Sequence, residues 1–228
     1  MLLPLYHGTQ QAQLEVKIDR EGNWLPGNAV AVDKKDQETL VLTTEKSSNR
    51  TSSPEPMPLF DKLVYVAGDY GIYCADRIKK EKEATPYELY LEALRRWCAS
   101  AYACQDVISW LRYVEKGCLI ADLLSEGIFK LDENGLLLDK WEGTGKAADV
   151  FIRIRVQMPD SLGECLWKNK SVSDSFIAYQ NSLPQETGLC YVLGREMAVS
   201  NMDTSEYSSS PSRGRGLKSA DNPVVRLV

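Results

Sequence analysis

Apolar and polar residues alternate along two stretches that lie far apart in the chain. Residues 14–18 carry Leu, Val and Ile at every second position, and residues 150–158 repeat the pattern with Val, Ile and Met. An apolar period of two predicts β-strands that each bury one face. The second stretch places Arg153 and Arg155 together on the opposite face of its strand, which we expect to be exposed.

Shorter apolar runs add further strands to this picture. Residues 29–32 and 39–42 are predicted strands, joined by a charged turn over residues 33–36. Together with the first alternating stretch they predict an N-terminal antiparallel sheet. The sequence Asp-Glu-Asn-Gly at 132–135 predicts a hairpin turn, and residues 188–193 predict a last strand.

The middle of the chain has helical periodicity. Thr85 can cap a helix, Pro86 suits its first position, and Glu88 completes a capping box. A second helix over residues 107–114 is closed by Gly117, which suits the left-handed position after a helix end.

The fold class that follows is α+β, with antiparallel sheets and a helical middle section. A further short helix is expected from a cap at Ser173 to Ser182. We expect residues 1–200 to form one α+β domain. Residues 201–228 begin with a Ser-, Pro-, Gly- and Arg-rich run that buries little, so they predict a flexible, low-complexity tail.

Composition excludes some classes of protein. A net charge of -5 with 43% hydrophobic residues is ordinary for a globular protein and unlike a dedicated, basic DNA-binding domain. The chain has neither an apolar run of about 18 residues nor a signal peptide, so we expect a cytoplasmic protein without a membrane partner. The six cysteines are scattered without a C-x-x-C pair, which argues against a zinc site.

No catalytic constellation is evident. The single histidine, His7, supports neither a triad nor a metal centre by itself, and a strand-edge position is the simpler interpretation. No P-loop, dinucleotide-binding or zinc-protease motif is present. The sequence therefore predicts a protein that is not an enzyme and needs no cofactor.

One polar segment does suggest chemistry. Residues 44–53 read Thr-Glu-Lys-Ser-Ser-Asn-Arg-Thr-Ser-Ser, with cations at Lys46 and Arg50. These side chains are donors that contact phosphates and base edges in nucleic acids, although such clusters are often only solvated loops. A helix predicted at 59–66 follows, after three prolines that stiffen the exit of the loop: Pro54, Pro56 and Pro58.

Several motifs along the chain resemble a known family in the same order. They are HGTQQAQLEVKIDREGNW at 7–24, TEKSSNRTSS at 44–53 with PLFDKLVYVAGDY at 58–70, GCLIADLLSEGIFKLDENG at 117–135, VFIRIRVQM at 150–158, CLWKNKSVSDSFIAYQ at 165–180 and LCYVLG at 189–194. Together they are similar to the N-terminal region of the large subunit of the type I-C (Dvulg subtype) CRISPR surveillance complex, Cascade.

The chain also departs from that family. Family members carry a helical segment before the first of these motifs, and an Asn-His-Pro step where this chain has Asn201 and Met202. Their C-terminal helical region has no counterpart before Val228. We therefore expect an N-terminal piece that is shorter than the family at both ends.

The resemblance implies a non-catalytic subunit that recognises the protospacer-adjacent motif in target double-stranded DNA. It would help to open the duplex for guide pairing in antiviral defence. The implied partners are that DNA, the crRNA-bearing subunits and the helicase-nuclease recruited by the complex. The candidate DNA-binding residues are Lys46, Asn49, Arg50, Thr51 and Ser52, with Lys62, Arg153 and Arg155 as secondary candidates.

Alternatives remain open at this point. Arg153 and Arg155 could pair with carboxylates as readily as with phosphates. The whole chain could be a truncated fragment that acts only as a protein–protein interaction module of the complex. An unrelated soluble enzyme is a third possibility, which the missing catalytic constellation disfavours.

Overall fold

The computed structural model describes residues 3–48, 55–74, 84–138, 141, 146–157, 164–184, 187–190 and 195–198. Contacts within the chain divide it into two compact units, Met1–Gln180 and Asn181–Val228. The predicted boundary at residue 200 and the predicted tail lie in the second unit, where residues 199–228 are outside the described part. The tail therefore stays a prediction.

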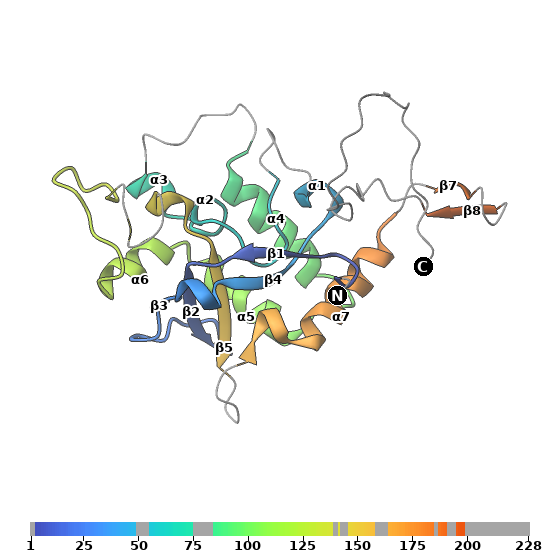
Figure 1. Ribbon diagram of the computed structural model, residues 1–228, viewed down its shortest axis with the longest axis horizontal. Helices are drawn as coiled ribbons and strands as arrows, with labels where there is room; N and C mark the ends of the chain where they lie inside the picture. The colour runs from blue at the N-terminus through green and yellow to red at the C-terminus, as the bar shows by residue number, and fades with distance from the viewer. Residues whose placement is uncertain are drawn as a thin grey trace, which may run out of the picture. The chain divides into compact units, whose positions relative to one another are not determined.

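A four-stranded mixed sheet lies at the centre of the first unit (Figure 1). Its strands are β3 (Val30–Ala31), β2 (Leu14–Asp19), β5 (Ile152–Gln157) and β6 (Glu164–Cys165), in that spatial order. The two long strands are the two alternating stretches of the sequence. Their apolar residues are at most 1% exposed: Leu14, Val16, Ile18, Ile152, Ile154 and Val156.

The pairing of β2 with β5 is parallel, and the sequence did not predict it. Leu14 lies opposite Ile152 and Asp19 opposite Gln157, so apolar residues match apolar ones along the whole register. The other pairings in this sheet are antiparallel. The α+β class is confirmed, because antiparallel and mixed sheets occur together with a helical middle section.

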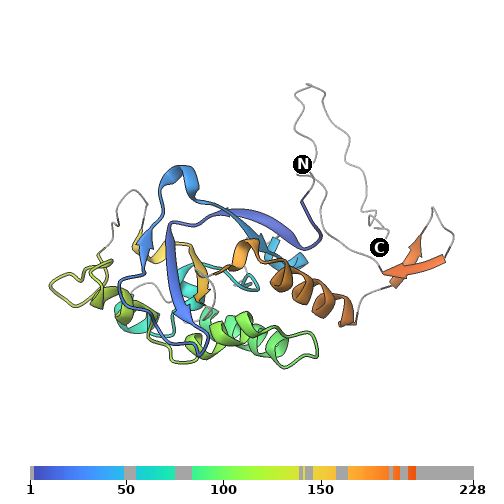
Figure 2. The same ribbon diagram turned by 90° about the horizontal axis from the view of Figure 1, so that it is seen from below.

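A second, two-stranded antiparallel sheet consists of β1 (His7–Gln11) and β4 (Glu38–Leu42). The predicted strands near 30 and 40 therefore exist, but they belong to different sheets. The short helix η1 (Lys34–Asp36) connects them. In Figure 2, β1 and β4 lie on one side of the central sheet, and the helices α4 and α5 lie on the other.

Those helices are α4 (Pro86–Cys98) and α5 (Gln105–Val114), and α5 packs against both β2 and β5. The capping box predicted at Thr85 is confirmed: its side chain accepts from Glu88 N, and the Glu88 carboxylate accepts from Thr85 N. The remaining short elements are α1 (Glu45–Ser48), α2 (Leu63–Val66), α3 (Tyr70–Tyr73), α6 (Leu119–Ser125), η3 (Ala147–Asp149), η4 (Leu166–Lys168) and α7 (Lys170–Ser182).

Two helix starts differ from the prediction. The helix expected at 59–66 begins only at Leu63, because residues 57–62 form a turn around the buried carboxylate of Asp61. The helix expected from a Ser173 cap begins at Lys170. There, Asn169 Oδ1 accepts from the backbone N–H of Ser171 at 2.9 Å, while the Ser173 hydroxyl bonds elsewhere.

Large aromatic side chains fill the space between the helices and the sheet. Trp97 meets Phe176 edge-to-face at 5.0 Å between ring centroids, and Trp110 stacks on Tyr113 at 5.5 Å. Trp110 Nε1 donates to the Tyr90 hydroxyl at 2.6 Å, so its polar atom is satisfied inside the core. Both tryptophans are buried in the core, at 1% exposure for Trp97 and 0% for Trp110.

Each of the two units contains a hairpin. The turn at 132–135 is confirmed: Gly135 has a φ of 78°, and Asp132 Oδ1 accepts from two backbone N–H groups. Its arms meet in one bridge between Leu131 and Leu137. In the second unit, β7 (Thr187–Cys190) pairs antiparallel with β8 (Arg195–Ala198), and residues 191–193 of the predicted last strand lie outside the described residues.

Two glycines allow the backbone before α3 to touch the backbone before α6. A methyl group added to Gly68 would lie 2.7 Å from the Cα of Gly117 and 2.8 Å from Cζ of Tyr87. The tyrosine cannot easily move aside, because its hydroxyl donates to Val114 O at 2.7 Å. Gly117 has a φ of 64°, as expected for the residue that closes α5.

We expect Gly68→Ala to lower the free energy of unfolding by about 1–3 kcal/mol, because the added methyl would overpack against a backbone that has no room to give. Urea denaturation followed by tryptophan fluorescence measures this. Gly8→Ala is the control, since its methyl would meet only side chains, Thr43 at 3.2 Å and Val41 at 3.9 Å, and no backbone. Equal losses in the two variants would contradict the interpretation.

Candidate nucleic-acid interface

The helix α1 carries the first candidate residue, Lys46, directly after β4. Its start is capped reciprocally: Thr44 N–H donates to Ser47 Oγ at 2.8 Å, and Ser47 N–H donates to Thr44 Oγ1 at 3.1 Å. Ser48 Oγ donates to Thr44 O at 2.9 Å. The first hydroxyl groups of the predicted loop thus stabilise the backbone, while Lys46 is exposed.

The segment that enters α1 is tied to the start of the chain. Thr43 N–H donates to Tyr6 O at 2.9 Å, and Tyr6 holds a left-handed φ of 57°. The next residue, His7, is buried, with Nδ1 2.7 Å from Leu5 O and Nε2 3.1 Å from Ser173 Oγ. His7 therefore lies in a strand and joins β1 to α7.

The segment that leaves the loop is fixed even more firmly. The Asp61 carboxylate, which is fully buried, accepts from the backbone N–H of Met57 and of Lys62, each at 2.8 Å. Leu59 O accepts from the Tyr90 hydroxyl of α4 at 2.8 Å. The stiff exit predicted from the prolines is present, and buried hydrogen bonds contribute to it.

Asn49, Arg50, Thr51 and Ser52 lie outside the described residues, so their role remains a prediction. Lys62 is described: its Nζ is 3.3 Å from Asp149 Oδ1, with side chains 43% and 60% exposed. An ion pair this exposed contributes little to stability, and its lysine can exchange the carboxylate for another anion at small cost.

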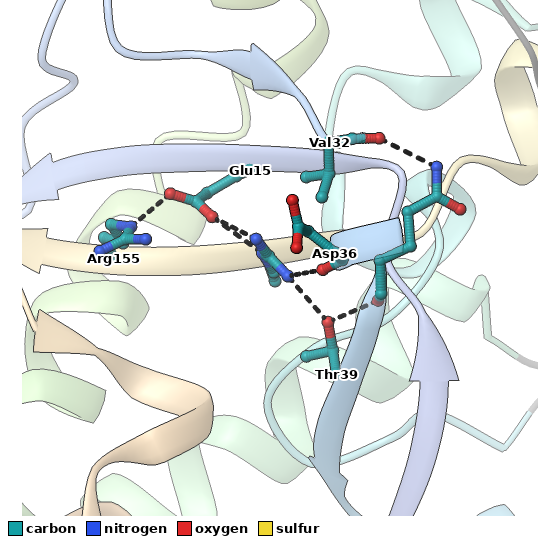
Figure 3. A network of polar contacts seen from close by, with 7 residues as sticks. Glu15, Val32, Asp36, Thr39 and Arg155 are labelled. Carbon is teal, nitrogen blue, oxygen red and sulfur yellow. Dashed lines mark hydrogen bonds and ion pairs between the residues drawn. The ribbon is translucent and has the colours of Figure 1, made fainter. Parts of the chain in front are cut away.

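The prediction that Arg153 and Arg155 share an exposed face is wrong for Arg153, which is 8% exposed. Figure 3 shows the carboxylate of Glu15 and the side chain of Arg155 pointing toward one another. Arg153 Nε and Nη2 each lie 2.8 Å from Glu15 Oε2, and Nη1 donates to Asp36 O at 2.8 Å and to Thr39 Oγ1 at 3.3 Å. Arg155 Nε donates to the other Glu15 oxygen. The parallel register sets Glu15 directly opposite Arg153, so the carboxylate and both guanidinium groups share one face of the sheet.

This cluster keeps an excess of positive charge, because two guanidinium groups share one carboxylate. Burial alone would lower the pKa of Arg155, but the hydrogen bond and charge of Glu15 outweigh it and raise that pKa. Trp167 packs against both cations, with its ring centroid 4.2 Å from Arg153 Cζ and 5.2 Å from Arg155 Cζ. Sequence reasoning missed Glu15 and Trp167 as partners of the arginines, since each lies on a different element.

The described residues contain no group of three or more His, Cys, Asp and Glu side chains that could hold a metal ion. None of the described helices is both long and apolar enough to cross a membrane.

Sequence comparison identifies the family. Residues 1–215 match the profile of the family described as CRISPR-associated protein (Cas_Csd1). The chain belongs to the Csd1 family. This is the large-subunit family of the type I-C CRISPR complex, so the chain is a CRISPR-associated Cascade subunit. No curated protein matches the chain.

For this Csd1 chain, the geometry divides the described candidate cations into three kinds. Lys46 and Lys62 are exposed or weakly paired; Lys46 lies in the donor-rich segment and Lys62 follows it in the chain. Arg153 is enclosed by Glu15, the carbonyl of Asp36 and the hydroxyl of Thr39, and holds strands and η1 together. Arg155 is intermediate, with 31% of its side chain exposed.

We expect Glu15→Ala to destabilise this Csd1 chain by about 3–5 kcal/mol, because it would leave the buried Arg153 without its counter-charge. Thermal and urea unfolding measure the loss. Glu92→Ala is the matched control: it breaks an exposed ion pair with Arg96 within α4 and should cost less than about 0.5 kcal/mol. A Glu15→Ala variant as stable as the control would show that the pair is not structural.

Proposed function

We propose that this chain recognises the protospacer-adjacent motif in target double-stranded DNA and helps to open the duplex for guide pairing. In RNA-guided complexes the guide reads the target by base pairing, while protein reads a short flanking motif. The reading segment is the polar stretch 44–53, which was expected to be a loop throughout and whose first part folds as α1. In this proposal the chain recognises DNA in antiviral defence and does not itself catalyse a reaction.

The observation that carries this proposal is the anchoring of both flanks of the loop. On one side, Thr44 and Ser47 cap α1, and the N–H of Thr43 donates to the carbonyl of Tyr6, directly before β1. On the other side, the buried Asp61 holds residues 57–62 in a turn. Loops that recognise ligands work best on such rigid supports, because the donors then keep their positions without a large loss of entropy on binding.

The residue roles follow from side-chain chemistry. Arg50 and Asn49 can make bidentate contacts with base edges, and Thr51 and Ser52 can bond to bases or phosphates. Lys46 is exposed at the entrance of the loop and suits a phosphate contact. Lys62 serves as a backbone contact that exchanges its weak pair with Asp149 for a phosphate. We assign Arg153 a structural role and no contact with DNA.

The partners proposed for the chain are target DNA, the crRNA-bearing subunits and the helicase-nuclease recruited by the complex, all in the cytoplasm. The central experiment reconstitutes the complex with its guide. Fluorescence anisotropy then compares a motif-bearing duplex with a motif-less one, after selection from duplexes with randomised flanks has defined the motif. If the complex assembles with this chain but discriminates no flank, the chain acts only as a protein–protein interaction module.

Arg50→Ala should reduce the preference of the assembled complex for the motif-bearing duplex by about 1–3 kcal/mol, the usual contribution of one good base-edge contact. Arg112→Ala, which removes an exposed arginine of α5, is the control and should leave the preference unchanged. Guide-dependent assembly should persist in both variants. Equal motif preference in the Arg50 variant and the unaltered complex would remove Arg50 from the reading site.

The isolated chain should bind duplex DNA weakly and with little sequence preference. A net charge of -5 repels DNA at long range, and one loop with two cations releases few counterions. Within the complex, the guide and partner subunits raise the effective concentration of the loop at its target. Anisotropy titrations at matched salt compare the chain with the complex. Tight, motif-selective binding by the chain alone would contradict this dependence on assembly.

A further inference from the structure

A second group of cations lies on the polar face of the central sheet. Lys17 of β2 lies directly opposite Arg155 of β5 in the parallel register, so both side chains project from the same face. Arg155 has 31% of its side chain exposed, and Lys17 is partly exposed. Lys17 forms no ion pair with any residue in the described part of the chain.

Neighbouring acids neutralise the cations of this face only in part. Both oxygens of Glu15 are already occupied, one by Arg153 and the other by Arg155. The next acid on this face of β2 is Asp19, whose oxygens accept from the backbone and side-chain nitrogens of Asn23 at 2.7 and 2.9 Å. This face therefore carries the three cations Lys17, Arg153 and Arg155 against the two carboxylates of Glu15 and Asp19, and Lys17 is the cation without an ion pair among the described residues.

The position of Arg155 is also fixed in advance. Glu15 accepts from its Nε, the side chain of Cys165 also bonds to it, and Trp167 packs 5.2 Å from its Cζ, so the partly exposed guanidinium is held in place rather than left on a mobile side chain. A guanidinium held in this way loses little entropy when it binds an anion, and its planar fork suits the oxygens of a phosphate. Arg153 acts through Glu15 as a positioning residue, because it holds the carboxylate from the other side.

We propose that Arg155 and Lys17 form a second contact with the phosphodiester backbone of a nucleic acid, separate from the motif-reading loop. The inference rests on the proposed function only in taking the ligand to be a nucleic acid of the same complex. The contact carries no sequence information, since phosphates are alike along the strand. Its effect is to strengthen binding to every sequence equally.

The test uses the full chain at low salt with three fluorescein-labelled probes of one mixed sequence: duplex DNA, single-stranded DNA and single-stranded RNA. Arg155→Gln and Lys17→Gln are compared with the unaltered chain over a salt series. Each variant should reduce the slope of log affinity against log salt by about 0.9 for duplex DNA or about 0.7 for a single strand, one phosphate contact each. The probe with the largest change identifies the strand that this face contacts.

Two control variants, and the absence of a described ion pair at Lys17, make the outcome decisive. Lys130→Gln removes an exposed lysine from the hairpin arm and should leave the slope unchanged. Arg155→Lys keeps the charge and should retain most of the slope. Lys17→Gln breaks no described ion pair, so it tests the contact even where Arg155→Gln lowers the melting temperature.

Unchanged slopes in both Gln variants would overturn the inference, as would an equal reduction in Lys130→Gln, which would indicate only net charge. Loss of assembly with partner subunits at unchanged strand binding would also overturn it, because the face would then meet an acidic protein. Failure of the proposed function looks different: motif preference would then be absent while the slopes still respond to Arg155 and Lys17.

Discussion

The carboxylate of Glu15 lies between two guanidinium groups, and much of the first unit is organised around it. Through Arg153 it connects β2 and β5 to the carbonyl of Asp36 in η1 and the hydroxyl of Thr39 in β4. Trp167 of η4 closes the cluster from another side. A buried charge is costly unless it is paired and hydrogen-bonded. Arg153 can therefore be buried on the polar face of the central sheet only because Glu15, the carbonyl of Asp36 and the hydroxyl of Thr39 all bond to it.

This constraint reaches the proposed reading loop. The strand β4 leads directly into α1, and Thr39 near its start is bonded to Arg153, so the cluster helps to determine where the loop begins. Where the loop ends, the backbone N–H of Ile152 in β5 donates to Asp61 O at 3.1 Å. Strand β5 thus bonds to the chain on both sides of a segment that is rich in donor side chains, which is how a stable scaffold usually presents a recognition loop.

Charge is distributed to match such a role. The chain as a whole is acidic, at -5, and its candidate contacts are a few local cations instead of a broad basic surface. Long-range attraction to DNA is therefore weak, which favours recognition within an assembly over independent scanning. Membership in the Csd1 family, a family of Cascade large subunits, agrees with this distribution.

Local patterns determined a large part of the fold. The alternation in β2 and β5, the capping box at Thr85 and the turn closed by Gly135 each depend on residues within a few positions of one another, and all three are confirmed. The donor-rich segment at 44–53 was equally visible in the sequence, because its composition alone marks it. The family was visible too, since several separate motifs occur in order.

Tertiary structure determined which of these elements contact each other and which side chains their contacts bury. Arg153 was expected on an exposed face, but its partner Glu15 is 138 residues away, and Thr39 of β4 also bonds to it. Helix α2 starts late because Asp61 is buried against the core, and Ser173 bonds to His7 in place of capping a helix. Burial and pairing between distant residues depend on which strands become neighbours, and alternation along one strand carries no information about its neighbour.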